Sequence, residues 1–482
     1  MLFPSEIFLF VFLPAVLLLY YVLPRNAKPL KNILLFLASL FFYAWGEPEY
    51  VFLMLLVILL SYLSGILIDH LLKSADDRLH APSLCSKKTA ALLVLILTVC
   101  MDLGILGWFK YSTFVLNQLN IRLHTNFTLP LLALPIGISF FTFQAMSYVF
   151  DIYRRQAKAQ KNPLLVGLYI SLFPQLIAGP IVRYETIAAQ MEHRVETFED
   201  FSAGIARFCI GLGKKVLLAN NMALIADNAF KMIFSGRYGA SVATAWLGAV
   251  SYTLQIFFDF SGYSDMAIGL GLMFGFHFEE NFNYPYISAT VSEFWRRWHI
   301  SLQTWFRDYV YFPLGGSRVP LKRLVCNLFI VWLLTGIWHG ASFTFIAWGL
   351  LYFVLLTFEK LTGLNKKRFW WSHLYTMFFV MLGWVIFRSP TLSDALIYLK
   401  AMFGIGASGL MDSSVLPYLR QNLVYYVAAF ICCVPVFPFL EKKFASSRIW
   451  QGAYVIGISA IFILSLSFIS NNAYSPFIYF NF

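Results

Sequence analysis

Charged residues are scarce in this chain of 482 residues, because Asp, Glu, Lys and Arg make up only 12% of it. An ordinary soluble domain contains about 25%, so the shortage excludes a typical soluble globular protein. Hydrophobic residues make up 59% instead. Apolar stretches of roughly 20 residues, the length that crosses a hydrocarbon core of about 30 Å, recur along almost the whole chain. The composition therefore indicates an all-α integral membrane protein.

Cysteine motifs, internal repeats and long soluble insertions are also missing. The six cysteines show no CxxC spacing, which argues against a disulfide framework or a zinc site, and no metal is expected. Without a linker, residues 1–482 are predicted to form a single membrane domain. A secondary transporter should show repeated halves with matching midplane carboxylates, and neither is found. A scaffold for polymer export would account for the spans but not for the histidine motifs.

About eleven apolar stretches are candidate membrane spans, and several of them are short or broken. Proline and glycine interrupt the sequences LALPIGISFFTFQ and FPQLIAGP. Such breaks survive in a membrane only where protein or a water-filled cavity satisfies the backbone, so we expect a multi-span bundle with broken, re-entrant and interfacial helices around a cavity. The predicted spans cover approximately residues 5–23, 31–45, 50–69, 90–108, 130–150, 164–180, 242–276 (long enough for two pieces), 324–340, 342–358, 370–388, 422–440 and 452–470.

Basic residues outnumber acidic ones, and the net charge is +12. Lysine and arginine collect in several loops and in the segment 294–323, which the positive-inside rule assigns to the cytoplasmic side; the loop 46–49 and both termini then lie outside. This bias and anionic lipid head groups account for the charge, so membrane lipid is an expected partner and nucleic acid is not. Residues 181–240 have apolar residues at helical spacing beside charged ones. This pattern predicts helices in the membrane interface or packed under the bundle.

The segment 279–323 is the most unusual one, because it combines tryptophans with basic residues on the predicted cytoplasmic side. One interpretation is an interfacial helix with an aromatic belt and arginines that reach the head groups. The other is a donor site in which basic side chains pair with phosphates and indole rings stack on a planar base, as an adenine cofactor with phosphates requires. The residues concerned are Trp295, Arg296, Arg297, Trp298, Trp305, Lys322 and Arg323.

A histidine, His339, stands between two apolar runs in the sequence LTGIWHGAS. Histidine in such a place is usually a neutral packing residue, but ionisable residues inside a membrane are costly and mark functional sites. Gly336 and Gly340 allow other groups to approach the ring closely. The runs 324–340 and 342–358 predict a tight hairpin that begins and ends on the cytoplasmic side, with His339 at its tip. A base reached from both sides is what chemistry across a membrane requires.

These motifs resemble a known family. FWRRWHISLQTWFRDYVYFPLGG followed by LTGIWHGAS is similar to the signature of the membrane-bound O-acyltransferase (MBOAT) family, in particular its bacterial alginate O-acetylation branch. QLIAGPIVRY, ENFNYPY, the opening LFPSEIFLFVFLP and the final SPFIYFNF extend the resemblance over essentially the whole chain. The resemblance implies an O-acyltransferase built as a multi-span helical bundle around a central funnel.

The resemblance also implies roles for particular residues. His339 would be the catalytic base and His299 a second catalytic histidine on the cytoplasmic side. Acetyl-CoA would be the donor substrate, whose thiol arm reaches His339 through the funnel. Apart from the resemblance, the position of Asp259 and Asp265 within an apolar segment makes them candidates to orient a site residue or to line the cavity, with a structural hydrogen bond as an equal alternative. The donor-binding set further includes Asn281 and Tyr286, which share that alternative, and Gln175 and Arg183 at the cytoplasmic entrance.

The final residues, SPFIYFNF, are mostly aromatic. One interpretation is an aromatic anchor at the membrane interface. The other is that the tail folds back into the outer funnel and that Tyr479 accepts the acyl group as an aryl ester. A phenolate, with a reference pKa of about 10, is a far better leaving group than an alkoxide, so the ester would keep its transfer potential. Similar tails in acyl-transfer systems of this type support that role.

The expected function is transfer of an acetyl group from cytosolic acetyl-CoA across a bacterial inner membrane, for O-acetylation of a secreted or cell-surface polysaccharide. The resemblance implies a soluble extracytoplasmic acetyltransferase of the SGNH-hydrolase type as partner, which places the acetyl group on the sugar. The identity of the polymer stays open. The nearest alternative is D-alanyl transfer to teichoic acid from a carrier-protein thioester.

Overall fold

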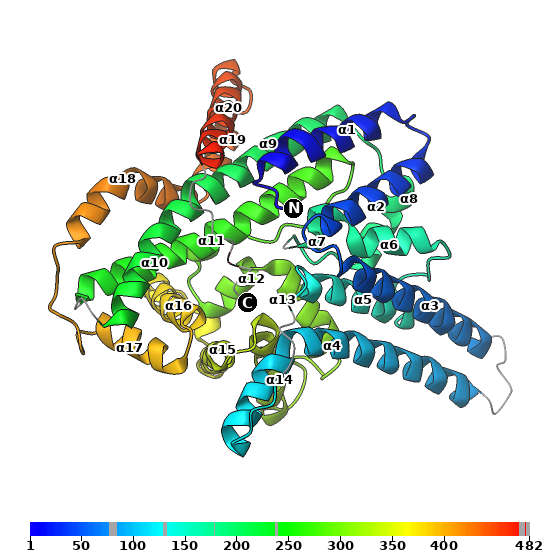
Figure 1. Cartoon of the computed structure of the whole chain (residues 1–482), viewed down its shortest axis with the longest axis horizontal. Helices are drawn as coiled ribbons and strands as arrows, with labels where there is room; N and C mark the ends of the chain where they lie inside the picture. The colour runs from blue at the N-terminus through cyan, green and yellow to red at the C-terminus, as the bar shows by residue number, and fades with distance from the viewer. Residues whose placement is uncertain (77–83, 129–132, 178, 237–239, 472–477, 479–482) are drawn as a thin grey trace. The chain divides into compact units, whose positions relative to one another are not determined.

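The computed structural model is helical, without a strand, in the part of the chain that it describes: residues 1–76, 84–128, 133–177, 179–236, 240–471 and 478. This confirms the all-α prediction. The contacts divide the chain into two compact units, Met1–Ile205 with Ala267–Glu279 (unit 1) and Ala206–Met266 with Glu280–Phe482 (unit 2). Figure 1 labels their helices. A single domain over residues 1–482 stays a prediction.

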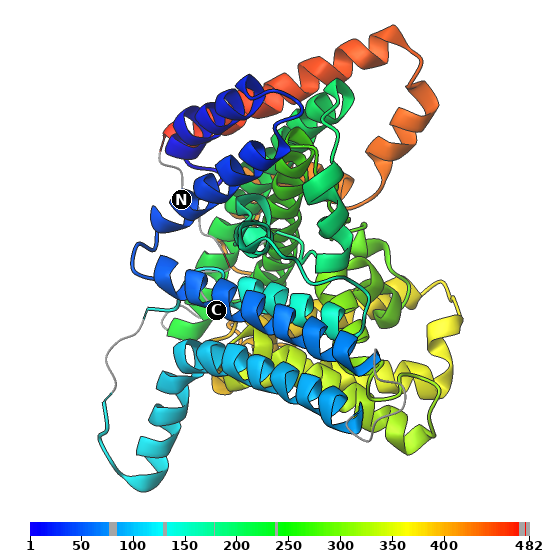
Figure 2. The ribbon, with the colours of Figure 1, turned by 90° about the vertical axis from the view of Figure 1, so that its right-hand side faces the viewer.

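Unit 1 contains the first helices of the chain, and its longest two, α3 and α4, lie side by side (Figure 2). Its elements are η1 (Phe8–Phe12), α1 (Leu13–Val22), α2 (Lys28–Ala44), α3 (Val51–Asp76), α4 (Leu84–Leu123), α5 (Ile138–Tyr153), α6 (Pro163–Ser171), α7 (Phe173–Leu176) and α8 (Tyr184–His193). The predicted breaks are confirmed, because α5 begins only after the sequence PIG and α6 ends before the short α7. Gly137 precedes α5 with a φ of 75°, a conformation that favours glycine.

Unit 2 contains the predicted histidine segments. Its elements are η2 (Lys214–Ala219), α10 (Asn220–Ser235), η3 (Pro285–Ile287), α12 (Val291–Arg297), α13 (Ile300–Phe306), η4 (Arg307–Tyr311), α14 (Leu321–His339), α15 (Phe343–Thr362), η5 (Leu364–Lys366), α16 (Ser372–Arg388), α17 (Leu392–Met402), α18 (Val415–Cys432), α19 (Val436–Phe444) and α20 (Arg448–Ser470). Two helices, α9 (Phe198–Gly213) and α11 (Val242–Met273), have residues in both units. The region predicted as one or two spans at 242–276 is thus one unbroken helix.

Six helical runs among the described residues are long and apolar enough to cross a membrane, or seven if the bent pair α18 and α19 forms one span. These are fewer than the predicted spans, because several of the predicted spans, such as α1 and α16, are shorter apolar helices. The run Phe198–Ser235 is one of the six. This run was not among the predicted spans, and α9, η2 and α10 continue one another in it without a break. The place of these helices in the membrane interface or under the bundle stays a prediction.

The predicted hairpin is confirmed as α14 and α15, and its ends have causes in the sequence. Pro320, which lacks a backbone N–H, directly precedes α14. The side chain of Ser342 caps α15 by accepting a hydrogen bond from the Thr344 backbone N–H at 3.3 Å. A Cβ atom on Gly336 would lie 2.6 Å from the carbonyl oxygen of Phe345. The group that approaches this glycine closely is therefore the backbone of α15.

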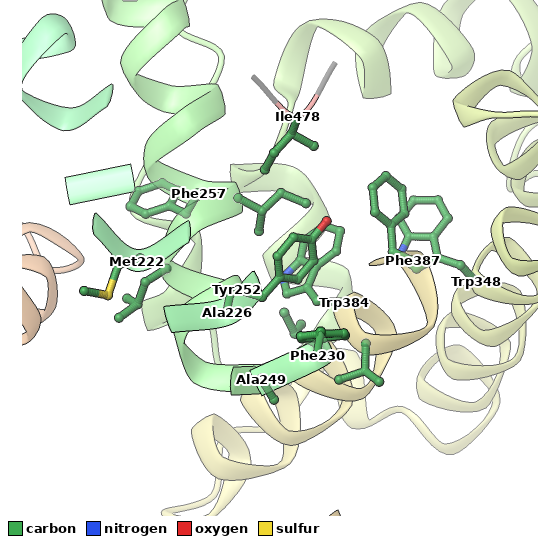
Figure 3. Packing of buried hydrophobic residues seen from close by; sticks show 14 of the residues in the cluster. Met222, Ala226, Phe230, Ala249, Tyr252, Phe257, Trp348, Trp384, Phe387 and Ile478 are labelled. Carbon is green, nitrogen blue, oxygen red and sulfur yellow. The ribbon is translucent and has the colours of Figure 1, made fainter. Parts of the chain in front are cut away.

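Aromatic side chains form much of the buried core of unit 2 (Figure 3). Tyr252 of α11, Trp348 of α15 and Trp384 of α16 belong to it, and so does Ile478, which is 4% exposed. Large rings of this kind dominate the burial of apolar surface. The core therefore holds together elements that are far apart in the sequence.

Candidate active site

His339 is the last residue of α14 and lies half-buried at the end of the hairpin helix. Three aromatic rings stand nearly perpendicular to its imidazole, with centroids 4.9 Å away for Trp338, 4.9 Å for Trp348 and 5.1 Å for Phe387. Trp348 comes from α15 and Phe387 from α16, and Figure 3 shows both. Packing from three helices therefore fixes the orientation of the His339 ring.

His299 is buried between α12 and α13, outside the candidate spans. Its φ of 47° is a left-handed conformation that is uncommon for a residue other than glycine. The ring lies 6.2 Å from Trp338 between centroids, with an interplanar angle of 75°. The two histidines that the sequence singled out are thus brought together around one indole ring.

Burial lowers the pKa of His299 to about 3, because an apolar environment disfavours the charged imidazolium. The ring is therefore neutral near pH 7. A neutral imidazole offers one hydrogen-bond donor and one acceptor, which suits orienting a reacting group rather than pairing with a phosphate.

Asn281 holds the backbone that follows His299. The Asn281 Oδ1 atom accepts hydrogen bonds from the backbone N–H of Ser301 at 3.1 Å and from its hydroxyl at 3.0 Å. The carbonyl oxygen of Asn281 accepts a third from the Ile300 N–H at 2.9 Å. These contacts fix the start of α13. Asn281 thus makes the structural hydrogen bonds that were the alternative to donor binding, and binding of the donor by Asn281 stays a prediction.

The three tryptophans predicted to bind the donor are buried among protein side chains. Trp295 lies 4.8 Å from both Trp332 and Tyr352 between ring centroids. Trp298 and Trp305 are buried too. The hydroxyl of Tyr286, also in the predicted donor set, donates to the carbonyl oxygen of Thr253, and its ring stacks on Phe294 and Trp298. Stacking of any of these rings on an adenine stays a prediction.

The basic residues of the same segment differ in exposure. Arg297 forms an ion pair with Glu293, one helical turn earlier, at 2.9 Å. Arg296, Lys322 and Arg323 are exposed. Of the predicted phosphate partners, these three present their charges at the surface.

Gln175 and Arg183 belong to unit 1. Gln175 is buried, and its Nε2 atom donates to the carbonyl oxygen of Tyr169 at 2.7 Å. Arg183 pairs with Glu185 at 3.1 Å and, at 4.0 Å, with Glu279. Both side chains have partners within unit 1, and their place at the donor entrance stays a prediction.

The two aspartates of α11 are buried and paired. Asp259 forms an ion pair with Lys215 at 2.7 Å, and both side chains are 2% exposed. The Oδ2 atom of Asp259 also accepts a hydrogen bond from the backbone N–H of Ile478 at 3.0 Å. Asp265 pairs with Arg207 at 2.6 Å. Asp259 therefore connects the interior of unit 2 to the end of the chain.

Tyr479, the predicted acyl acceptor, falls outside the described residues, and its role stays a prediction.

Two further findings concern metal binding and the neighbours of His339. Among the described residues, no group of three or more His, Cys, Asp and Glu side chains is arranged to hold a metal ion. Trp348 and Phe387, which contact His339, were not predicted, because nothing distinguishes them in a chain with 13 tryptophans and 50 phenylalanines.

The chain resembles known proteins along its whole length. The model of the membrane-bound O-acyltransferase family matches residues 89–388. A probable alginate O-acetylase AlgI of Pseudomonas putida is 38% identical over 100% of both chains. A peptidoglycan O-acetyltransferase of Helicobacter pylori is 35% identical over 100% of this chain and 98% of its own. A teichoic acid D-alanyltransferase of Bacillus subtilis is 31% identical over 52% of this chain and 68% of its own.

The family match, the named relatives and the apolar helices all indicate the same class of protein. The relatives that match over the full length are named as O-acetylating enzymes, and the apolar helices are those of a multi-pass membrane protein. The chain is an O-acyltransferase, and it belongs to the membrane-bound O-acyltransferase family.

Proposed function

We propose that the protein transfers an acetyl group from cytosolic acetyl-CoA across the inner membrane for O-acetylation of a secreted or cell-surface polysaccharide. The observation that carries this proposal is the position of His339 and His299 around Trp338. Acyl transfer to a hydroxyl needs a base, and histidine, with a reference pKa of about 6.5, can take and return a proton near neutral pH. The names of the alginate and peptidoglycan relatives support acetyl as the group and a polysaccharide as the final acceptor.

In the proposed reaction His339 removes the proton of an acceptor hydroxyl, whose oxygen attacks the carbonyl carbon of the thioester. The carbon–sulfur bond then breaks, and the proton passes from His339 to the sulfur of CoA. His299, buried and neutral, orients a reacting group by a hydrogen bond. The exposed side chains of Arg296, Lys322 and Arg323 pair with the phosphates of the donor.

The first acceptor in this proposal is the phenol of Tyr479, which becomes an aryl ester. Support comes from the preceding residue, because Ile478 is buried in the aromatic cluster that includes Trp348 and Phe387, both beside the His339 ring (Figure 3). A partner of the SGNH-hydrolase type outside the membrane then moves the acetyl group from the tyrosine to the polysaccharide. Loss of a phenolate makes this second transfer favourable.

Intact-mass measurement and peptide mapping after incubation with acetyl-CoA test the proposal. The comparison includes wild type, His339→Ala, Tyr479→Phe and His373→Ala, a control that removes an exposed histidine of α16. Wild type and the control are expected to carry one acetyl group on Tyr479. His339→Ala and Tyr479→Phe are expected to carry none.

Other outcomes separate the parts of the proposal. If wild type releases CoA only when an acceptor is added and never carries the label, Tyr479 is an anchor and transfer is direct. If wild type neither releases CoA nor gains mass, the donor assignment fails. If His339→Ala is acetylated at the wild-type rate, the assignment of the base fails.

D-alanyl transfer to teichoic acid is the second candidate, because a D-alanyltransferase of Bacillus subtilis matches about half of the chain. Its donor would be a carrier-protein thioester, which presents the same thiol arm as CoA. Incubation with a D-alanyl carrier thioester in place of acetyl-CoA distinguishes the two by the mass added to the protein.

A further inference from the structure

Glu359 is a carboxylate with 0% exposure near the end of α15. It accepts three hydrogen bonds from the start of α12. The Val291 N–H donates to Oε1 at 2.6 Å, and the N–H and hydroxyl of Ser292 donate to Oε2 at 2.9 and 2.6 Å. Backbone N–H groups in the first turn of a helix have no partner within the helix and favour a negative charge. Glu359 therefore ties α12 to α15.

The start of α12 also has a local cap. The hydroxyl of Thr290 accepts a hydrogen bond from the Glu293 N–H at 3.0 Å, and the Glu293 carboxylate accepts one from the Ala289 N–H at 3.1 Å. This reciprocal arrangement resembles a capping box, which stabilises a helix start without help from another helix. What Glu359 adds is a directed link to a second helix.

The two helices also contact each other beyond this link. Trp295 of α12 lies 4.8 Å from Tyr352 and 5.5 Å from Trp348 of α15 between ring centroids. Hydrophobic attraction is not directional, so ring packing alone permits small shifts of α12 along α15. The three hydrogen bonds to Glu359 have fixed geometry and prevent such shifts. Since α12 ends two residues before His299, its position constrains where that ring lies, together with the Asn281 hydrogen bonds that hold the residues after the histidine.

We propose that Glu359 is a positioning residue for acyl transfer, which places His299 relative to His339 by holding α12 at one point along α15. The inference rests on the proposed function of the two histidines. Because α15 begins four residues after His339, this helix is the element to which both histidine segments are attached. A displacement of about 1 Å at a reacting group can cost about 100-fold in rate, so a small slip of α12 has a large effect.

The test compares Glu359→Gln with a matched control, Asp412→Asn, in the full-length protein. Glutamine has one acceptor oxygen and an NH2 donor, so a backbone N–H of Val291 or Ser292 loses its acceptor. Asp412 is also a carboxylate that accepts hydrogen bonds at the start of a helix, α11. The donors are the N–H of Ser241 at 3.1 Å and the hydroxyl of Thr244. Asp412 lies outside both histidine segments.

Two readouts separate positioning from general stability. Initial rates of CoA release, measured with acetyl-CoA and an acceptor for the acetyl group both present, give kcat and KM, and hydrogen exchange measured by mass spectrometry gives the protection of residues 291–297. Glu359→Gln is expected to lower kcat about 10-fold or more at an unchanged KM and to speed exchange in α12. Asp412→Asn is expected to lower the thermal unfolding temperature while kcat stays at the wild-type value.

The inference would be overturned by a wild-type kcat in Glu359→Gln, by a rise in KM without a fall in kcat, or by faster exchange spread evenly over α12, α14 and α15. Exchange needs no donor, so unchanged protection of α12 in Glu359→Gln also overturns it whichever thioester the enzyme uses. A His339→Ala variant with the wild-type rate would instead overturn the proposed function.

Discussion

Single residues inside unit 2 carry charges that lie far from water. Lys215 and Asp259 form an ion pair in which both side chains are 2% exposed. Lys215 also donates to Asn220 at 3.0 Å, and Asp259 accepts from the N–H of Ile478. Removal of one charge leaves the other buried without its counterion. Asp259→Leu is therefore expected to lower the free energy of unfolding by about 3–5 kcal/mol, measured by thermal or denaturant unfolding in detergent.

The double variant Lys215→Met with Asp259→Leu is the control for this prediction. Apolar replacement of both partners of a buried pair is often neutral or stabilising, so most of the lost stability should return. In the proposed relay, acetylation of Tyr479 should fall below the wild-type level in both variants, because both lack the acceptor for the Ile478 N–H. A double variant as unstable as Asp259→Leu would show that loss of packing volume, not an unpaired charge, causes the effect.

The sequence predicts the two histidines because they stand in unusual motifs, but it does not predict their partners. Glu359 sits at the end of an apolar run beside Lys360, where it looks like an ordinary charged residue at a helix end. Its bonds to Val291 and Ser292 join residues that are 68 and 67 positions apart. Only the tertiary packing brings such residues together, and no local pattern encodes it.

At the scale of helices, the α14 and α15 hairpin depends on a missing side chain. A Cβ atom at Gly336 would lie 2.6 Å from the Phe345 carbonyl oxygen, and backbone cannot move aside as a flexible side chain can. Gly336→Ala is expected to lower the free energy of unfolding by about 1–3 kcal/mol, measured by denaturant unfolding in detergent. It is also expected to slow CoA release, since His339 follows three residues later. Gly457→Ala on α20 is the control, because nothing lies within 4 Å of that position. The free energy of unfolding of the control should rise by up to about 1 kcal/mol, because alanine has a higher helix propensity than glycine.

The segment between α8 and α9 carries a pH-dependent contact within unit 1. Burial alone would raise the pKa of Glu196, but ion pairing with Lys28 at 2.7 Å and a hydrogen bond from Tyr20 at 2.7 Å lower it to about 2 from an ordinary value of 4.5. A carboxylate with a lowered pKa stabilises the fold above its unfolded-state pKa and loses this effect as pH falls through the folded-state pKa.

The comparison of wild type with Glu196→Gln tests this contact. Wild type is expected to be the more stable protein at pH 7, and the difference in unfolding temperature should narrow as pH falls from 4.5 toward 2. A difference that stays constant over this range would show that Glu196 does not titrate with a lowered pKa.

Helix breaks and helix continuity differ in how well the sequence predicts them. The breaks beside Gly137 and before α7 follow from glycine and proline, whose backbone effects are local. The unbroken run Phe198–Ser235 was harder to predict, since charged residues such as Lys215 suggest a surface helix. In the structure that lysine is buried because Asp259 pairs with it, a contact that the sequence of the run does not reveal.

At the scale of the whole molecule, the distribution of basic residues predicts that the loop 46–49 lies outside and the loop after α15 lies inside. In a chain whose native cysteines are replaced, Glu49→Cys should react with a membrane-impermeant maleimide in intact spheroplasts. Lys367→Cys should react only after the membrane is permeabilised. The opposite pattern would reverse the orientation and place both termini inside.

The division of the chain into two units is a property that the sequence did not reveal. No linker marks a boundary, and α9 and α11 each run from one unit into the other without interruption. Composition detects domains only where a flexible segment separates them. Here the units are defined by which helices pack together.

The hydrogen bond between Ile478 and Asp259 has a consequence for biosynthesis. A ribosome makes Lys215 and Asp259 before it reaches residue 478, which is 219 positions beyond Asp259, so the third partner of the buried pair is added much later than the pair itself. A truncated product that ends before residue 478 cannot make this contact. In the proposed relay, only a chain translated beyond that residue can accept an acetyl group, so prematurely terminated products would not consume the donor in this way.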